Sequence, residues 1–85
     1  MVQFSCVIKE ELGIHARPAG QIAKKAKTMD CAVTISCGEN SCDARKLMKL
    51  MSLEAQKDDT LVVTVEGPDE GAAAKELEQF LGEII

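Results

Sequence analysis

The amino-acid sequence predicts an α+β domain in which four strands form an antiparallel sheet and three helices cover one of its faces. Two kinds of hydrophobic periodicity support this prediction: some segments alternate apolar and polar residues, whereas others repeat apolar residues at helical spacing. Their order along the chain is strand, helix, strand, strand, helix, strand, helix. The 85 residues contain no repeat and no linker, so residues 1–85 are expected to form a single domain. Covering one face of the sheet buries every apolar stripe and leaves the other face to water.

Three segments carry the two-residue alternation that is typical of strands with one buried face. Residues 2–8 show it first, and the same pattern recurs in residues 33–37 and 60–66. Gly38 is followed by a short segment, residues 40–43, and glycine readily adopts the positive φ values that tight turns need. We therefore expect residues 33–43 to form a hairpin.

Three segments show helical spacing of apolar residues. The first helix begins just before Pro18, whose fixed φ suits a first turn, and ends before residues 28–30. Residues 47–53 are apolar on every side of a short helix, which is more than such a helix can bury. The last helix follows Gly67, with Asp69 expected to cap it. Its expected apolar stripe comprises Ala73, Leu77, Phe80 and Ile84, widened by Ala74 and Leu81.

Charge and composition restrict the classes of function. Hydrophobic residues make up 46% of the chain, but only Phe4 and Phe80 are aromatic, so a deep stacking pocket is not expected. The formal net charge of -4 and the pI of about 4.9 argue against binding of a nucleic-acid backbone. No apolar segment approaches a membrane span and no secretion signal is visible, so we expect a cytoplasmic protein.

The cysteines are expected to remain reduced thiols. Cys6, Cys31, Cys37 and Cys42 lack the paired spacings of a zinc site, and no secretion signal favours disulfides. Cys6 and Cys37 lie in phase with apolar strand positions and are expected in the core, whereas Cys42 could face either way. Neither a metal nor a cofactor is expected.

The chain's single histidine, His15, lies next to an arginine at the expected start of the first helix. Imidazole is one of the few side chains that accept a phosphoryl or acyl group and release it near neutral pH. Free N–H groups at a helix start favour an anion, and the Arg17 guanidinium can bind two phosphate oxygens. The residues alone leave a second interpretation open, because a lone histidine is more often a helix cap or a surface residue.

The segment Gly13-Ile14-His15-Ala16-Arg17-Pro18-Ala19 resembles the phosphorylation motif of HPr, the histidine-containing phosphocarrier family of the bacterial phosphoenolpyruvate-dependent sugar phosphotransferase system. Residues 47–53 and the turn at residues 67–70 also fit that family, so the resemblance covers nearly the entire chain. It implies an HPr-like open-faced sandwich with the order βαββαβα. It also implies a phosphoryl carrier rather than an enzyme, in which Nδ1 of His15 is phosphorylated and Arg17 stabilises the phosphate.

Further expectations follow from this resemblance. Backbone N–H groups of Ala16 and Arg17 would bind the phosphate oxygens, because Pro18 has none to offer. Enzyme I would phosphorylate His15, and sugar-specific enzyme IIA proteins would receive the group from what is expected to be a monomer. The partner-binding residues would be Leu47, Met48, Met51 and Gly20.

Other assignments remain open from the sequence. An HPr-like paralogue in a specialised phosphorelay would share this chemistry, and a binding module whose histidine is never phosphorylated would not. If the family resemblance is set aside, the exposed part of residues 47–53 could equally be a docking patch or surface that contacts no partner.

One position departs from the family pattern. In many Gram-positive members a regulatory serine precedes the short helix, whereas this chain has Lys46. Since no hydroxyl is available there, the usual serine control is expected to be missing.

Overall fold

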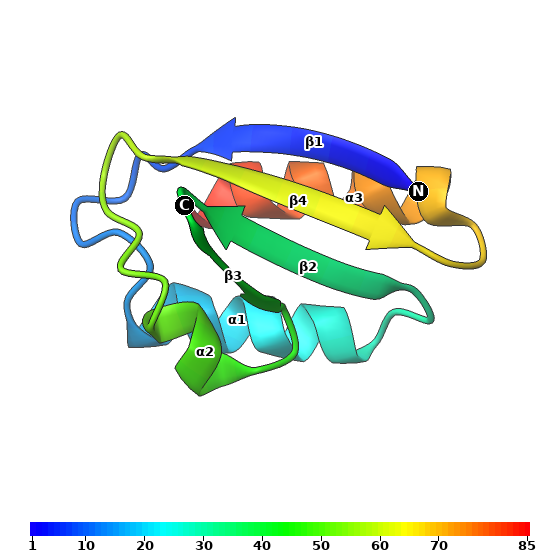
Figure 1. The fold of residues 1–85 in the computed structure, drawn as a ribbon, viewed down its shortest axis with the longest axis horizontal. Helices are drawn as coiled ribbons and strands as arrows, with labels where there is room; N and C mark the ends of the chain where they lie inside the picture. Colours follow the sequence, from blue (N-terminus) through cyan, green and yellow to red (C-terminus); the bar gives the residue numbers. More distant parts are fainter.

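The computed structural model describes residues 1–85 and has the predicted order of elements (Figure 1). Its strands are β1 (Val2–Val7), β2 (Ala32–Cys37), β3 (Asn40–Asp43) and β4 (Thr60–Glu66), and its helices are α1 (Ala16–Lys27), α2 (Leu47–Met51) and α3 (Glu70–Ile84). All strand pairs are antiparallel, in the spatial order β1-β4-β2-β3. The predicted α+β open-faced sandwich is therefore confirmed. The short helix ends earlier than expected, because Ser52 closes it with N–H bonds to the Met48 and Lys49 carbonyls.

The register of the sheet explains why alternation predicted the strands so well. Val63 of β4 lies between Phe4 of β1 and Ile35 of β2, so apolar residues form a row across three strands. Leu61 lies in the next row, between Cys6 and Cys37. These two cysteines were expected in the core, but they are half-buried and pack against its border, since β1 is an edge strand and Cys37 ends β2.

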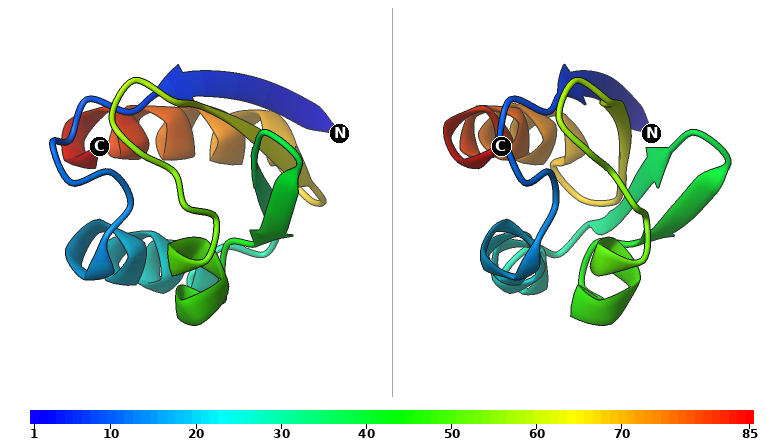
Figure 2. Two further views of the ribbon diagram at one scale, coloured as in Figure 1. Left: turned by 60° about the vertical axis from the view of Figure 1, so that its left-hand side comes forward. Right: turned by 90° about the vertical axis from the view of Figure 1, so that its left-hand side faces the viewer.

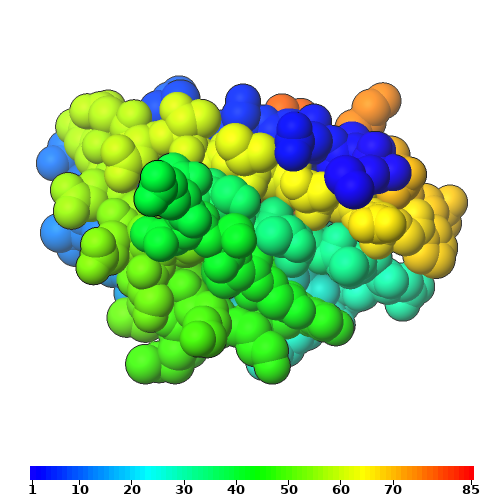
Figure 3. Space-filling view, in the orientation of Figure 1, coloured from blue at the N-terminus to red at the C-terminus, as the bar shows by residue number.

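The helices lie on one side of the sheet (Figure 2). Helix α3 packs on β1 and β4, while α2 packs against both α1 and β3. Together they bury 20 hydrophobic residues, and no polar or charged residue is buried with them. The opposite face of the sheet is open at the surface, where blue, yellow and green strand residues are visible side by side (Figure 3). No helix combines the length and apolar character needed to cross a membrane.

Helices α1 and α3 are linked by one lysine. Lys25 Nζ lies 3.0 Å from Glu76 Oε1 and 5.6 Å from the centre of the Phe80 ring. The ammonium group is thus placed for an ion pair and for a cation–π contact with the same helix. This contact connects α1 to the C-terminal helix α3.

Helix α3 differs from the sequence prediction in two details. Its most buried positions are Ala74, Leu77 and Leu81, whereas Ala73, Phe80 and Ile84 are only partly buried. Asp69 does occupy the N-cap position, but its backbone is left-handed (φ 53°) and its side chain makes no capping hydrogen bond. The expected side-chain cap is therefore wrong.

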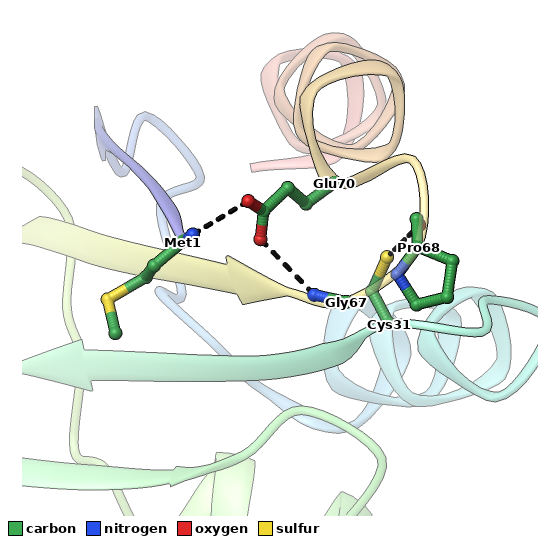
Figure 4. A network of polar contacts seen from close by, with 5 residues as sticks. All are labelled: Met1, Cys31, Gly67, Pro68 and Glu70. Carbon is green, nitrogen blue, oxygen red and sulfur yellow. Dashed lines mark hydrogen bonds and ion pairs between the residues drawn. The ribbon is translucent and has the colours of Figure 1, made fainter.

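Glu70 supplies the polar contacts at this helix start instead (Figure 4). Its Oε2 accepts a 3.2 Å hydrogen bond from the Gly67 N–H, and its Oε1 lies 2.7 Å from the amino group of Met1. The Cys31 thiol donates to the Pro68 carbonyl at 2.9 Å beside this contact. These contacts join the first strand, the turn at residues 67–69 and the last helix.

The Glu70 contacts predict a dependence of stability on pH. The hydrogen bonds from the Met1 amino group and then from Gly67 lower the pKa of the Glu70 carboxyl below its ordinary value. A lowered folded-state pKa stabilises the protein above the unfolded-state value, and this contribution is lost as the pH falls through the folded-state value. We expect Glu70→Gln to reduce the free energy of unfolding at neutral pH but not at acidic pH.

Urea denaturation between about pH 7 and pH 3, which spans the titration of carboxyl groups, measures this difference. Glu39→Gln is the matched control, because Glu39 is exposed in a turn and makes no ion pair. A constant difference between wild type and Glu70→Gln at every pH would contradict the prediction.

Candidate functional site

His15 is the N-cap residue of α1, as the position of Pro18 predicted. Its backbone is extended (φ -99°, ψ -172°), its side chain makes no capping hydrogen bond, and its carbonyl accepts the Ala19 N–H at 3.0 Å. The N–H groups of Ala16 and Arg17 make no backbone hydrogen bond. Pro18 is buried in the same turn and has no N–H. Two unpaired donors at the positive end of a helix dipole therefore lie next to the imidazole.

The loop before His15 is fixed by contacts with the segment that precedes β4. Gly13 has a φ of +66°, and a Cβ at this position would lie 2.3 Å from the Ala55 carbonyl oxygen. The next residue, Ile14, is buried and donates its N–H to the same oxygen at 3.0 Å. Glycine is required here because the backbones approach each other too closely for any side chain.

The two ring nitrogens of His15 lie in different environments. Nε2 is shielded from solvent and has no hydrogen-bond partner. The side chain nevertheless keeps 29% of its surface exposed, and Nδ1 is not shielded in this way. The ring therefore presents Nδ1, rather than Nε2, to an approaching group.

Glu10 lies between His15 and Arg17, a position that the sequence did not predict. Its Oε1 is 3.7 Å from His15 Nε2, and its Oε2 is 3.3 Å from Arg17 Nη2. The turn that brings it there is closed by a 3.0 Å bond from the Gly13 N–H to the Glu10 carbonyl. Glycine at the fourth position of a turn was the available signal, because type I turns favour it there.

Arg17 is close enough to His15 to share Glu10 with it, but its guanidinium is already partnered. Besides Glu10, it contacts Gln21 Oε1 at 3.4 Å, one turn further along α1. More than half of the side chain is exposed. An incoming anion would therefore have to compete with Glu10 for this cation.

The side chains expected to bind partners lie on α2 and α1, which pack side by side (Figure 2). On α2, Met48 is 71% exposed, and Leu47 and Met51 remain about 40% exposed. Two other residues of this segment, Leu50 and Leu53, are buried in the core. Gly20, on α1, leaves open space where a Cβ would stand. We name the exposed residues Leu47, Met48 and Met51 the α2 patch.

Cations surround part of the α2 patch. An open hollow of about 730 Å³ is lined by Lys27, Arg45, Lys46, Leu47, Met48 and Lys49. Asp43 accepts hydrogen bonds from the Arg45 backbone and side chain, which lowers the pKa of its carboxyl and fixes the approach to α2. This hollow is locally basic in a protein whose net charge is -4.

The cysteines form no second reactive site. All four are free, and burial, together with nearby acidic side chains, raises the pKa of each thiol above its ordinary value. The thiolate is the nucleophilic form, so these groups are poorly reactive near neutral pH. Nowhere do three histidine, cysteine or acidic side chains gather as metal ligands would.

Comparisons with known proteins agree with this fold and identify its family. A family model described as the "PTS HPr component phosphorylation site" matches residues 2–83. The phosphocarrier protein HPr of Borreliella burgdorferi is 36% identical over 81 residues, which covers 95% of this chain and 94% of the relative. That of Vibrio cholerae is 32% identical over 84 residues, covering 99% of each. A crystal structure of HPr from Thermoanaerobacter tengcongensis has a TM-score of 0.88 at 27% identity, covering 96% of this chain and 92% of that one. This chain therefore belongs to the HPr family of phosphocarrier components of the phosphotransferase system.

Proposed function

We propose that His15 accepts a phosphoryl group from phosphorylated Enzyme I and passes it to sugar-specific enzyme IIA proteins. The observation that carries this proposal is the environment of the ring. Its Nδ1 is accessible, whereas Nε2 is shielded, and the free N–H groups of Ala16 and Arg17 lie beside it. In a chain of the HPr family, this is the arrangement that a phosphohistidine carrier needs.

The transfer itself needs few groups from the carrier. The lone pair on Nδ1 attacks phosphorus, while the N–H groups of Ala16 and Arg17 hold the phosphoryl oxygens as the charge on them redistributes. The Arg17 guanidinium adds charge-assisted bonds to the same oxygens. No metal is required in the carrier, because positioning and hydrogen bonding supply the stabilisation.

The exposure of the site suits a carrier. A pocket that enclosed the phosphoryl group would stabilise phosphohistidine in the ground state and slow its delivery. With a half-buried ring and two backbone donors, the N–P bond stays accessible to the next acceptor. The site is thus adapted to receive and to release the same group.

We propose that the α2 patch and the basic hollow form the docking surface for both partners. Methionine is unbranched and repacks against different surfaces, which suits a protein with at least two partners. The four cations of the hollow favour partners that carry acidic groups around an apolar centre. The carrier acts as a monomer in this proposal, so that one surface serves Enzyme I and enzyme IIA in turn.

The proposed docking role of the α2 patch leads to a quantitative prediction. Met48→Ala should raise the KM of Enzyme I for the carrier roughly fivefold and leave kcat unchanged, because a docking residue contributes to binding rather than to chemistry. Steady-state phosphorylation at varied carrier concentration measures both constants. Val62→Ala is the control, since Val62 alternates with the buried Leu61 and Val63 and lies on the open sheet face. Equal KM values for wild type and Met48→Ala would contradict the docking role.

A lysine stands directly before α2, where many members of the family have a regulatory serine. Lys46 is the N-cap residue of α2 and makes no side-chain capping bond. Because no hydroxyl group stands at this position, we propose that the carrier is not controlled by a serine kinase there.

The proposal as a whole is tested with Enzyme I and labelled phosphoenolpyruvate. We expect one acid-labile, alkali-stable phosphate per chain, which is lost when an active enzyme IIA is added. Absence of label, with an Enzyme I that phosphorylates another HPr, would favour a binding module whose histidine is never phosphorylated. Label that no sugar-specific enzyme IIA removes would place the chain in a specialised phosphorelay.

A further inference from the structure

Glu10 is the one acidic side chain in contact with both functional side chains of the site. One carboxylate oxygen lies 3.7 Å from His15 Nε2 and the other lies 3.3 Å from Arg17 Nη2. The Glu10 side chain is only 27% exposed, so the carboxylate is partly withdrawn from water. Electrostatic interactions are stronger under such conditions than at a fully hydrated surface.

The backbone holds Glu10 in this place from both sides. Its N–H donates to the Ile85 carbonyl at 2.7 Å, and its carbonyl accepts the Gly13 N–H at 3.0 Å. The N–H of Lys9 also bonds to the Ile85 carbonyl. The Glu10 backbone is therefore fixed before any partner binds, and its carboxylate starts from a defined position beside His15 and Arg17.

The carboxylate determines which ring nitrogen carries the proton in neutral His15. Nε2 is shielded from water and has no hydrogen-bond partner, and Glu10 is the charged group that faces it. At 3.7 Å the contact is too long for a hydrogen bond, so its effect is through the electric field. An N–H at Nε2 is attracted by the carboxylate, whereas a lone pair there is repelled. The field thus places the proton on Nε2 and the lone pair on Nδ1.

We propose that Glu10 is a positioning residue for phosphoryl transfer, which holds the His15 proton on Nε2 so that Nδ1 is the nucleophile, and keeps Arg17 beside the ring. This inference rests on the proposed function, because it assigns a role in the transfer to and from His15. When the phosphoryl group arrives, the Arg17 guanidinium leaves Glu10 and binds the phosphoryl oxygens instead.

Phosphoryl transfer to His15 needs no further proton acceptor, because Nδ1 carries no proton that has to leave. The Nδ1 lone pair forms the N–P bond, and the bond between phosphorus and the donor breaks with its electron pair remaining on the donor. The Nε2 proton stays in place, so the ring becomes a cation that faces the Glu10 carboxylate. On delivery the N–P bond breaks, its electron pair returns to Nδ1, and the ring leaves as neutral imidazole, a much better leaving group than the imidazole anion.

Nitrogen-15 NMR of the labelled His15 ring tests the positioning role directly, because the two neutral tautomers differ in their ¹⁵N shifts. We expect wild type to be mainly the Nε2–H form and Glu10→Ala to contain more of the Nδ1–H form. Glu10→Gln keeps the size of the side chain but removes its charge, so it should also contain more of the Nδ1–H form than wild type if the electric field of the carboxylate sets the ratio. The control is Glu11→Ala, since Glu11 is 80% exposed and pairs with Lys57 rather than with His15.

Phosphorylation by Enzyme I provides the second readout. We expect Glu10→Ala to lower the rate constant about tenfold, which is less than the roughly hundredfold cost of misplacing a reacting group by an ångström. A wild-type ring that is mainly Nδ1–H, or an unchanged tautomer ratio and rate in Glu10→Ala, would overturn the inference while leaving the proposed function intact. A wild type that accepts no phosphoryl group would overturn the proposed function instead, and the tautomer ratio alone would then decide whether Glu10 orients the ring.

Discussion

Gly13→Ala should destabilise the folded protein by at least about 3 kcal/mol and disrupt the loop that presents His15. A left-handed backbone alone costs a residue with a Cβ about 1–2 kcal/mol. The added Cβ would also lie 2.3 Å from the Ala55 carbonyl oxygen and 2.8 Å from the Gln56 Cα. Both atoms belong to backbone, so the clash is relieved only by moving one chain segment away from the other. Urea denaturation measures the loss in the free energy of unfolding.

The effect of Gly13→Ala should extend to function. The displaced segment includes Ile14, whose N–H bonds to Ala55, and His15 directly after it. We therefore expect slower phosphorylation even at temperatures where the variant remains folded.

Gly20→Ala is the matched control for stability. Gly20 lies within α1, where an added Cβ would meet no atom within 4 Å. Alanine is favoured over glycine in a helix by about 1 kcal/mol, so this variant should be slightly more stable than wild type. Equal stabilities for the two variants would show that the close approach of Gly13 to Ala55 does not constrain the fold.

Sequence periodicity predicted the strands because the alternation of apolar and polar residues arises within each strand. Each strand must present apolar residues to the helices, and Phe4, Val63 and Ile35 do so in one row. Burial within a strand is less predictable, because it depends on which strands form the edges. Cys6 has the same phase as Phe4, and both are only half-buried at the border of the core because β1 is an edge strand.

Helix α3 shows a second limit of prediction from sequence. Its apolar stripe is broad, and tertiary packing on β1 and β4 selects Ala74, Leu77 and Leu81 from that stripe. The cap at Asp69 failed for a different reason. Its left-handed backbone turns the chain so that Glu70 accepts the Gly67 N–H, and a propensity for capping contains no information about that turn.

The candidate site was predictable where it depends on neighbours in sequence. His15, Ala16 and Arg17 lie at a helix start that Pro18 indicates, and the structure has them there. Glu10 was missed because its contact with His15 depends on the turn closed by Gly13 and on the bond to Ile85. The first of these is a local signal, but the second joins residues at opposite ends of the chain.

His15→Ala should abolish phosphoryl acceptance from Enzyme I, lowering the rate by at least about a thousandfold. His15 is the chain's single imidazole, and the shielding of Nε2 leaves Nδ1 as the nitrogen that a donor can reach. The fold should persist, because the His15 side chain makes no capping bond and its carbonyl bond to Ala19 is retained. We expect the free energy of unfolding to change by less than about 1 kcal/mol.

Labelled phosphoenolpyruvate and intact-protein mass spectrometry measure this loss, with thermal unfolding as the check on the fold. Wild type should gain one acid-labile phosphate and His15→Ala none. Cysteine is the alternative nucleophile to consider, and burial raises the pKa of all four thiols, so little thiolate is present near neutral pH. Label that persists in His15→Ala would therefore contradict the assignment of His15. A variant with no label but a normal fold would place phosphoryl acceptance on the His15 ring.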